Sequence, residues 1–247
     1  MSLLTGLLFE DKKDRARIDA EKQLREHFSK HGKVVDYTDK GFVIDGDVEL
    51  SHKFTGSKLP VKFDTVSGSF FISEVPIASL EGAPSSAQRV DISATNIKSL
   101  KGMPHTTLGI FASGLELPDL IGIPGDTKNI FLDHTVLKSL KGAPAEVPGK
   151  MRVNAKALAS LEHLPKVIGE LGLAELPKDF PLMRLFLSKI EKVVLKGDKI
   201  APPQGLPADK VEKLETIINK HLNKGRGGAV EAQKELMDSG LGEYGRV

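Results

Sequence analysis

Apolar and polar positions alternate in short three-residue segments that recur along residues 70–187. The outer two residues of each segment are apolar, whereas the middle residue varies among Phe, Asp, Arg and Gly. A position that accepts Asp and Arg faces solvent, so this alternation is typical of a half-buried β-strand. The pattern predicts strands at residues 70–72, 90–92, 110–112, 130–132, 151–153 and 171–173, with 185–187 as a candidate seventh strand.

A second apolar pattern follows five of these segments. One apolar residue stands five positions after the segment, and a leucine stands three positions further on. The first set is Ile77, Ile97, Leu117, Leu137 and Leu158, and the second is Leu80, Leu100, Leu120, Leu140 and Leu161. Each repeat therefore contributes about five apolar side chains to a shared interior, and only stacked copies can bury them.

The leucines belong to a motif, Ser-Leu-x-Gly-x-Pro, that returns at a fixed period. Ser79-Leu-Glu-Gly-Ala-Pro84 recurs in steps of 20, 20, 20 and 21 residues, ending with the looser copy Ser160-Leu-Glu-His-Leu-Pro165. Strands that recur in one direction at a fixed period form a parallel ladder, and so short a period leaves little room for a return helix. The expected fold class is α+β, a leucine-rich-repeat-like solenoid of about 20 residues per turn with a parallel β ladder.

The flanks of the repeats predict two further parts. Residues 11–31 have a thin apolar stripe that predicts a helix ended by Gly32, and residues 33–50 predict two or three strands with a turn at Asp39-Lys-Gly41. Residues 1–9 are interpreted as a tail that packs on this cap or is disordered, with a membrane-touching or partner-docking tail as the alternative. The first part thus comprises residues 1–56 and caps the solenoid of residues 57–200.

A helical hairpin is predicted after the solenoid. The Pro- and Gly-rich residues 201–207 read as a linker, residues 208–223 as a helix with one apolar face, and residues 229–239 as a second helix. Gly225-Arg-Gly-Gly228 is interpreted as the turn between the helices, with an anion-binding cradle as the alternative. Residues 201–247 form the third part.

Composition limits the chemistry that the chain can perform. The 247 residues carry a net charge of +2 and no cysteine, so disulfides and thiolate metal sites are excluded. No apolar run approaches the length of a transmembrane helix, so we expect no membrane partner. His27 and His31 are four residues apart, the spacing of a two-histidine metal face on a helix, but no third ligand is evident, which favours two solvated histidines. With no nucleophile motif and no facing carboxylates, we expect no cofactor and no enzymatic activity.

Residues 189–226 hold nine Lys or Arg against five Asp or Glu. Such an excess suits phosphate or RNA, yet no aromatic stacking platform accompanies it, so a solvated surface is the favoured interpretation and nucleic acid is the less favoured partner.

The middle residues of the strands predict a binding face. In a parallel ladder they align in one column, where exposed Phe and Arg suit a protein-binding hot spot. The column comprises Phe71, Asp91, Phe111, Phe131, Arg152, Gly172 and Phe186, and its neighbours are Arg89, Asn129, Asp133, Lys150 and Asn154. The alternative is that the phenylalanines pack along the sheet or are covered by the flanking parts.

The Ser-Leu-x-Gly-x-Pro repeat, together with the ending Ala232-Gln-Lys-Glu-Leu-Met-Asp-Ser-Gly240, resembles leucine-rich-repeat proteins of tailed bacteriophages over about residues 57–240. After its strands this chain has Ser73, Ser93, Ser113, Asp133 and Asn154, which argues against a continuous buried asparagine ladder. The resemblance implies an accessory protein that binds a host or phage protein, in the cytoplasm of a bacterial host or in the virion. A self-associating virion component and a nucleic-acid binder are the alternative functions.

Overall fold

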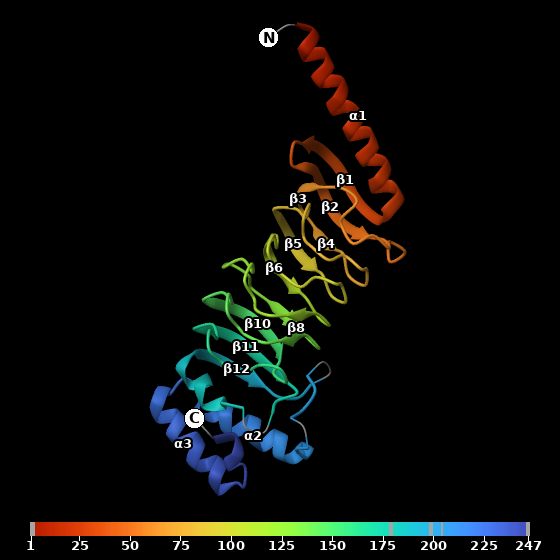
Figure 1. The fold of residues 1–247 in the computed structure, drawn as a ribbon. Helices are drawn as coiled ribbons and strands as arrows, with labels where there is room; N and C mark the ends of the chain where they lie inside the picture. The colour runs from red at the N-terminus through yellow and green to blue at the C-terminus, as the bar shows by residue number, and fades with distance from the viewer. Residues whose placement is uncertain (1–2, 178–179, 198–199, 204, 246–247) are drawn as a thin grey trace.

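The chain forms an elongated molecule with helices at both ends and stacked strands between them (Figure 1). The computed structural model describes residues 3–177, 180–197, 200–203 and 205–245, with side chains from Asp14 onward except that of Thr107. Helix α1 (Leu3–His27) stands at one end, and helices α2 (Ala208–His221) and α3 (Gly225–Asp238) lie at the other. This α+β solenoid with terminal helices confirms the predicted fold class.

One sheet runs the length of the solenoid. Its order is β1-β2-β4-β5-β6-β8-β10-β11-β12, with β3 beside β2, and only the pair β1–β2 is antiparallel among these strands. The strands are β1 (Phe28–Thr38), β2 (Gly41–Leu50), β3 (Phe63–Val66), β4 (Ser69–Phe71), β5 (Ser86–Asp91), β6 (His105–Phe111), β8 (Ile130–Leu132), β10 (Glu146–Asn154), β11 (Val167–Ala174) and β12 (Lys189–Val194). A small second ladder joins β7 (Glu116–Leu117) to β9 (Val136–Leu137) in parallel. The first six strand segments predicted from the alternation, from residues 70–72 to 171–173, all lie in or overlap strands of the long sheet.

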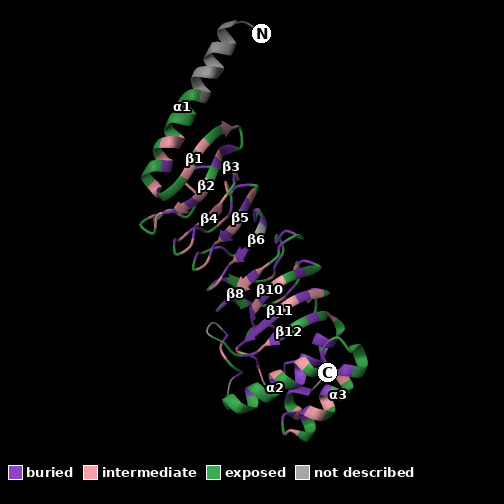
Figure 2. Cartoon of the chain, turned by 180° about the vertical axis from the view of Figure 1, so that it is seen from behind, coloured by how far each residue is buried: buried purple, intermediate pink, exposed green. Residues whose placement is uncertain are grey.

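The repeated apolar residues fill a continuous core inside the coils. Both sets of residues after the strands are buried, and Leu100, Leu120 and Leu140 are at most 1 % exposed. Figure 2 shows buried residues in every coil of the solenoid, while α1 is largely exposed where it is described. The period therefore predicted the interior correctly.

The structure explains why the motif is Ser-Leu-x-Gly-x-Pro. The leucine carbonyl accepts a hydrogen bond from the N–H three residues on, as in Ala83 N–H to Leu80 O, 3.0 Å. The third residue of this tight turn has a positive φ, +88° at Gly82, which favours glycine. The first residue stabilises the turn, because its side-chain oxygen accepts the N–H two residues on: Ser79, Ser99, Asp119, Ser139 and Ser160 all do so, at 3.0–3.4 Å.

The N-terminal helix differs from the prediction at both ends. It begins at Leu3, so the backbone of most of the supposed tail of residues 1–9 is helical, while Met1 and Ser2 lie outside the described residues. It ends at His27, because Phe28 already pairs with Leu50 across the hairpin β1–β2. Gly32 lies within β1 and does not stop a helix; a side chain there would clash with the backbone of Asp45 and Gly46. The turn at Asp39 and Lys40 between β1 and β2 is confirmed.

The seventh strand predicted at residues 185–187 is wrong. These residues belong to the 3₁₀ helix η1 (Leu182–Leu187), which follows Pro181 and buries Leu182, Met183, Leu185 and Phe186. The buried residues 182, 183, 185 and 186 are spaced as on one face of a helix. In addition, Phe186 is only 14 positions after Gly172, whereas a turn of the solenoid takes about 20 residues. The ladder continues instead at β12, where Val194 pairs with Gly172. The helical hairpin after it is confirmed as α2 and α3, although α3 already begins at Gly225.

Candidate binding face on the solenoid sheet

The predicted column exists as a row of neighbouring residues across the strands β4 to β11. Phe71 pairs with Asp91, Asp91 with Phe111 and Phe111 with Phe131, and the row continues through Arg152 to Gly172. The first five members, which are Phe71, Asp91, Phe111, Phe131 and Arg152, are half-buried. The strict alternation along each strand produces this row, since the residues on either side of each member point into the core.

Arg89 fills the space between two phenylalanines. Its guanidinium carbon lies 3.7 Å from the centre of the Phe111 ring and 5.4 Å from that of Phe71. Its register partner on β6 is Gly109, which has no side chain to compete for this space. One Nη of Arg89 also lies 3.4 Å from an oxygen of Asp91. The arginine is therefore held by a cation–π contact and an ion pair at once.

The next phenylalanines form a stack that ends on a second arginine. The rings of Phe111 and Phe131 are stacked, with centroids 4.6 Å apart and planes 29° apart. The guanidinium carbon of Arg152 lies 4.4 Å from the Phe131 centroid, and an Nη donates to Asp133 Oδ2 at 2.7 Å. Two rings are thus stacked between two guanidinium groups. We name the set Phe71, Arg89, Asp91, Phe111, Phe131, Asp133 and Arg152 the aromatic ladder.

The phenylalanines do pack along the sheet, as the alternative interpretation proposed. The arginines cover part of each ring, which reduces the cost of exposing aromatic surface to water. Stacking and ion pairs restrict the rotamers of these side chains, and the Arg152–Asp133 pair is largely shielded from water, with side chains 21 % and 9 % exposed. The side chains of the face are therefore already ordered by contacts with one another.

Asn129, a predicted neighbour of the ladder, has a structural role. Its amide nitrogen donates to Leu108 O at 2.6 Å, and its amide oxygen accepts the Lys150 N–H at 2.9 Å. Lys150 extends outward and its Nζ lies 3.2 Å from Glu170. Asn129 thus ties adjacent coils together, while Lys150 and Glu170 form an exposed charged edge beside the ladder.

The positions after the strands hold separate polar contacts and no continuous asparagine ladder. Ser113 N–H donates to Ser93 Oγ, Asp133 pairs with Arg152, and Asn154 donates to Glu175 Oε1 at 2.8 Å. The hydrogen bond from Asn154, followed by the contact with Lys156, holds the pKa of Glu175 below its usual range. Sequence reasoning did not single out Glu175, whose pairing depends on the register between β10 and β11.

The face ends abruptly at β11. Gly172 is buried, and a side chain there would meet Ile200 Cδ1 at 2.8 Å and Arg152 Cγ at 3.0 Å. Ile200 belongs to the segment after β12, and the Glu175 N–H holds that segment beside β11 by donating to Ala201 O at 3.0 Å. Phe186 is 3 % exposed inside η1 and is not part of the face, which corrects its assignment as a binding residue.

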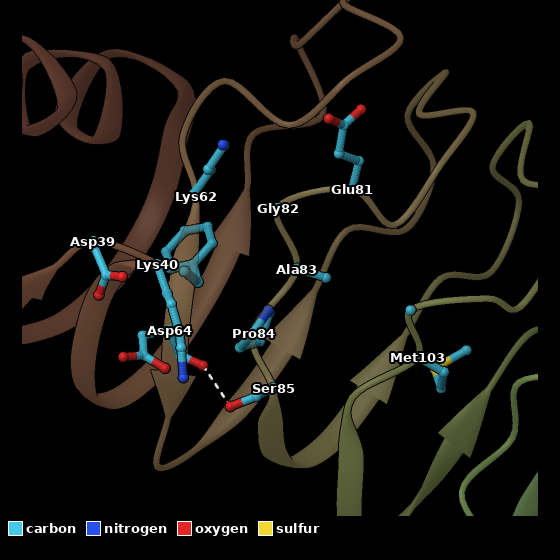
Figure 3. Close-up of a pocket in the computed structure, with 12 residues that line it drawn as sticks. Asp39, Lys40, Lys62, Asp64, Glu81, Gly82, Ala83, Pro84, Ser85 and Met103 are labelled. Atoms are coloured by element: carbon cyan, nitrogen blue, oxygen red, sulfur yellow. Dashed lines mark hydrogen bonds between the residues drawn. The ribbon is translucent and has the colours of Figure 1, made fainter.

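A hollow beside the N-terminal cap is lined by charged side chains. Figure 3 shows it at the turns beside β3, where Asp39, Lys40, Lys62 and Asp64 carry charges of both signs. Asp64 accepts hydrogen bonds from Thr38 Oγ1 at its carboxylate and from Ser85 Oγ at its backbone oxygen, both at 2.8 Å. These bonds fix the turn, and the cavity of about 450 Å³ brings no histidine to the carboxylate.

The histidine pair proposed as a metal face is separated by the fold. His27 ends α1 and its ring lies edge-on to Phe54, whereas His31 is in β1 and contacts its neighbouring backbone at Gly32 O. Within the described part of the chain, no group of three His, Cys, Asp or Glu is placed to hold a metal ion.

Among the described residues, no helix is both long and apolar enough to cross a bilayer. No protein-family model, curated protein or solved structure matches the chain.

Proposed function

We propose that this chain is a non-enzymatic protein–protein interaction module that binds its partner through the aromatic ladder. The observation that carries the proposal is the placement of three phenylalanines and two arginines, Arg89 and Arg152, on one face of the sheet. Aromatic residues and arginine dominate the binding energy of protein interfaces, and they do so in clusters near the centre. From Phe71 to Arg152 the row crosses four strand spacings, about 19 Å, which is the scale of an interface centre.

Rigidity supports the same proposal. Binding normally costs about 0.5–1.5 kcal/mol for each long side chain that becomes ordered. The stacking of Arg89 on Phe111 and the pairing of Arg152 with Asp133 order these arginines beforehand. The charged edge at Lys150 and Glu170 supplies the polar rim that surrounds such a centre.

Charge pairing favours a protein partner over nucleic acid. In the C-terminal region three lysines meet carboxylates: Lys196 with Glu212 at 3.1 Å, Lys220 with Glu235 at 2.8 Å and Lys224 with Glu231 at 3.6 Å. These ion pairs reduce the attraction of this surface for phosphates. The resemblance to leucine-rich-repeat proteins of tailed phages supports a host or phage protein as the partner, met in the bacterial cytoplasm or in the virion.

The test is a comparative capture experiment with purified variants. Phe111→Ala combined with Lys150→Glu removes one ring of the stack and reverses one rim charge, while the ion pair of Arg152 with Asp133 is left in place. Ile121→Ala with Val136→Ala is the matched control, since these side chains are 48 % and 47 % exposed and lie outside the ladder. Immobilised proteins are exposed to bacterial lysate, and retained proteins are quantified by mass spectrometry.

We expect the wild type and the control to retain the same lysate protein. The ladder variant is expected to retain at least tenfold less of that protein. Circular dichroism is expected to show all three folded. If the folded ladder variant retains the partner at the wild-type level, the aromatic ladder is not the binding face.

A further inference from the structure

An apolar groove lies at the C-terminal end of the molecule, outside the aromatic ladder. It is a cavity of about 450 Å³ between η1 and α3. Met183 and Phe186 line it from η1 and are buried, whereas Leu187 and Val230 line it with side chains that are 70 % and 66 % exposed. A cavity of this volume, lined mostly by apolar side chains and a few polar groups, is typical of a small-molecule site.

Helical spacing determines which side of α3 faces the groove. Arg226, Ala229, Val230 and Gln233 all line the cavity, and positions three or four residues apart lie on one side of a helix. At 1.5 Å per residue, this side of the helix extends about 10 Å from Arg226 to Gln233. An arginine therefore stands at one end of the α3 wall and an amide at the other, and the apolar stretch between them suits a single alkyl chain of medium length.

Two arginines place positive charge at the groove. Arg184 lines it from η1 and Arg226 from α3, and both residues are exposed. In the part of the chain that the structure describes, neither guanidinium group pairs with a carboxylate, and no Asp or Glu lines the cavity. The arginines of the aromatic ladder differ, because they are paired with Asp91 and Asp133. Guanidinium groups without an acidic partner on both walls of the groove favour an occupant that carries a negative charge.

The first turn of α3 adds to this positive charge. It is formed by Gly225-Arg-Gly-Gly228, the sequence for which an anion-binding cradle was the alternative interpretation. The turn holds no acidic residue, and no side chain caps it. Its surface is open, since a Cβ at Gly225 or Gly227 would meet no described atom within 4 Å. The N–H groups of a first turn lack partners within the helix and carry partial positive charge, so they reinforce Arg226 at the same end of the groove.

We propose that the η1–α3 groove binds a free fatty acid of medium chain length. Its carboxylate lies at the first turn of α3 and accepts hydrogen bonds from Arg184 and Arg226. Its alkyl chain extends along α3 between Leu187 and Val230, over the buried ring of Phe186. Binding removes exposed apolar surface from water, while the guanidinium groups select an anionic head group. The groove is separate from the aromatic ladder, so this inference goes beyond the proposed function and does not rest on it.

Isothermal titration calorimetry of the full chain with decanoate tests the site. We expect one saturable site with a dissociation constant in the micromolar range. Hexanoate has the same head group and a shorter chain, and it is expected to bind at least tenfold more weakly because fewer CH₂ groups are buried. Decanol has the same chain without the charge, and it is also expected to bind at least tenfold more weakly. Absence of saturable decanoate binding, or equal affinities for decanoate and decanol, overturns the proposal.

The double change Arg184→Gln with Arg226→Gln tests the position of the head group. This variant is expected to bind decanoate at least tenfold more weakly than the wild type but decanol equally well, so that the preference for the charged ligand disappears. Lys210→Gln with Lys213→Gln on α2 is the matched control, because it removes the same two charges at exposed positions outside the groove. The control should keep the wild-type preference. An arginine variant that keeps this preference contradicts the proposed site.

The double change Leu187→Ser with Val230→Ser tests the position of the alkyl chain. It is expected to weaken decanoate and decanol binding alike, by at least tenfold, because both exposed side chains contact the chain. Met237→Ser on α3, at a side chain that is 60 % exposed and outside the groove, is the control and should bind decanoate like the wild type. Circular dichroism checks that every variant is folded. Wild-type affinity of the folded Leu187 and Val230 variant for decanoate overturns the assigned groove. The aromatic ladder is intact in all these variants, so capture of its partner reports separately on the proposed function.

Discussion

Individual leucines determine how the coils of the solenoid are held together. Leu120 is completely buried between the equivalent residues of the neighbouring coils, Leu100 and Leu140. The change Leu120→Ala is expected to lower the free energy of unfolding by about 2–5 kcal/mol, because it removes buried apolar surface and leaves a cavity. Denaturant unfolding measures the change. The adjacent Ile121→Ala, at a side chain that is 48 % exposed, is the control and should stay within about 0.5 kcal/mol of the wild type. Equal effects of the two changes would contradict the assigned interior.

The irregular fifth copy of the turn gives a prediction of the opposite sign. His163 has a φ of +65° where the preceding copies place glycine, such as Gly142 at +86°. A side chain in this left-handed conformation costs about 1–2 kcal/mol. His163→Gly is therefore expected to raise the free energy of unfolding by about 1 kcal/mol, after the greater freedom of the unfolded glycine is included.

Gly142→Ala is the reciprocal variant, and it should be clearly destabilising because a Cβ would clash with the backbone of Leu120 and Ile121. Chemical denaturation of both proteins measures the pair. A loss of stability in His163→Gly would show that the imidazole makes a contribution larger than the strain of its backbone.

Residue identities could be predicted from the sequence wherever a single period decided them. The interior leucines and the row from Phe71 to Arg152 follow from alternation and a fixed repeat, which set the direction of every side chain. The stacking of Arg89 on Phe111 could not be derived in the same way, since it depends on the rotamer and on the gap at Gly109. Side-chain geometry of this kind is decided by packing, which the period of the sequence does not determine.

At the scale of elements, errors occurred where the repeat ended. The apolar triplet at residues 185–187 has the composition of a strand, but it lies in η1, and the strand β12 follows it at Lys189–Val194. Here the length of the turn was the better signal, because the step from Gly172 to Val194 is 22 residues, close to the established period. The end of α1 was misplaced for a similar reason: pairing of β1 with β2 overrides the helix propensity of the residues around Ser29.

A polar contact between α2 and α3 stabilises the C-terminal hairpin, and it predicts that the stability of the protein depends on pH. His221 ends α2 with only 6 % of its side chain exposed, and its ring nitrogens contact Glu231 at 3.1 Å and Glu235 at 2.8 Å. The bond with His221, followed by that with Lys220, lowers the pKa of Glu235. A carboxyl whose pKa is lower in the folded state stabilises the protein above its unfolded pKa, and this stabilisation is lost as the pH falls through the folded value.

The comparison of wild type with Glu235→Gln isolates this contribution from those of other carboxyls. The wild type is expected to melt at a higher temperature than the variant near neutral pH, and the difference should shrink as the pH falls below about 5. Thermal melts followed by circular dichroism at several pH values measure it. A difference that is constant with pH would mean that the Glu235 charge does not stabilise the hairpin.

At the scale of the whole molecule, the cap and the solenoid share one sheet and one core. Strand β2 pairs with β1 on one side and with β3 and β4 on the other. The ring of Phe63 lies 5.5 Å from Phe28, 6.3 Å from Phe42 and 5.4 Å from Phe70, so aromatic contacts run from the hairpin into the first coil. The sequence indicated a cap from the general need to cover the open end of a solenoid, but the shared sheet depends on long-range pairing that local patterns do not record.

Deletion of residues 1–50 is expected to destroy this continuity. It removes β1 and β2, exposes Phe63 and Phe70, and leaves the edges of β3 and β4 open to pairing with other chains. The fragment should aggregate, or unfold at lower denaturant concentration with reduced cooperativity, as measured by size-exclusion chromatography and denaturant titration. Deletion of residues 1–17 is the matched control, since it keeps Leu24, which is buried, and the hairpin β1–β2. That shorter deletion should remain folded and soluble. A soluble, monomeric fragment 51–247 that unfolds as cooperatively as the full chain would show that the solenoid needs no cap, and that the hairpin is an appendage in spite of the sheet they share.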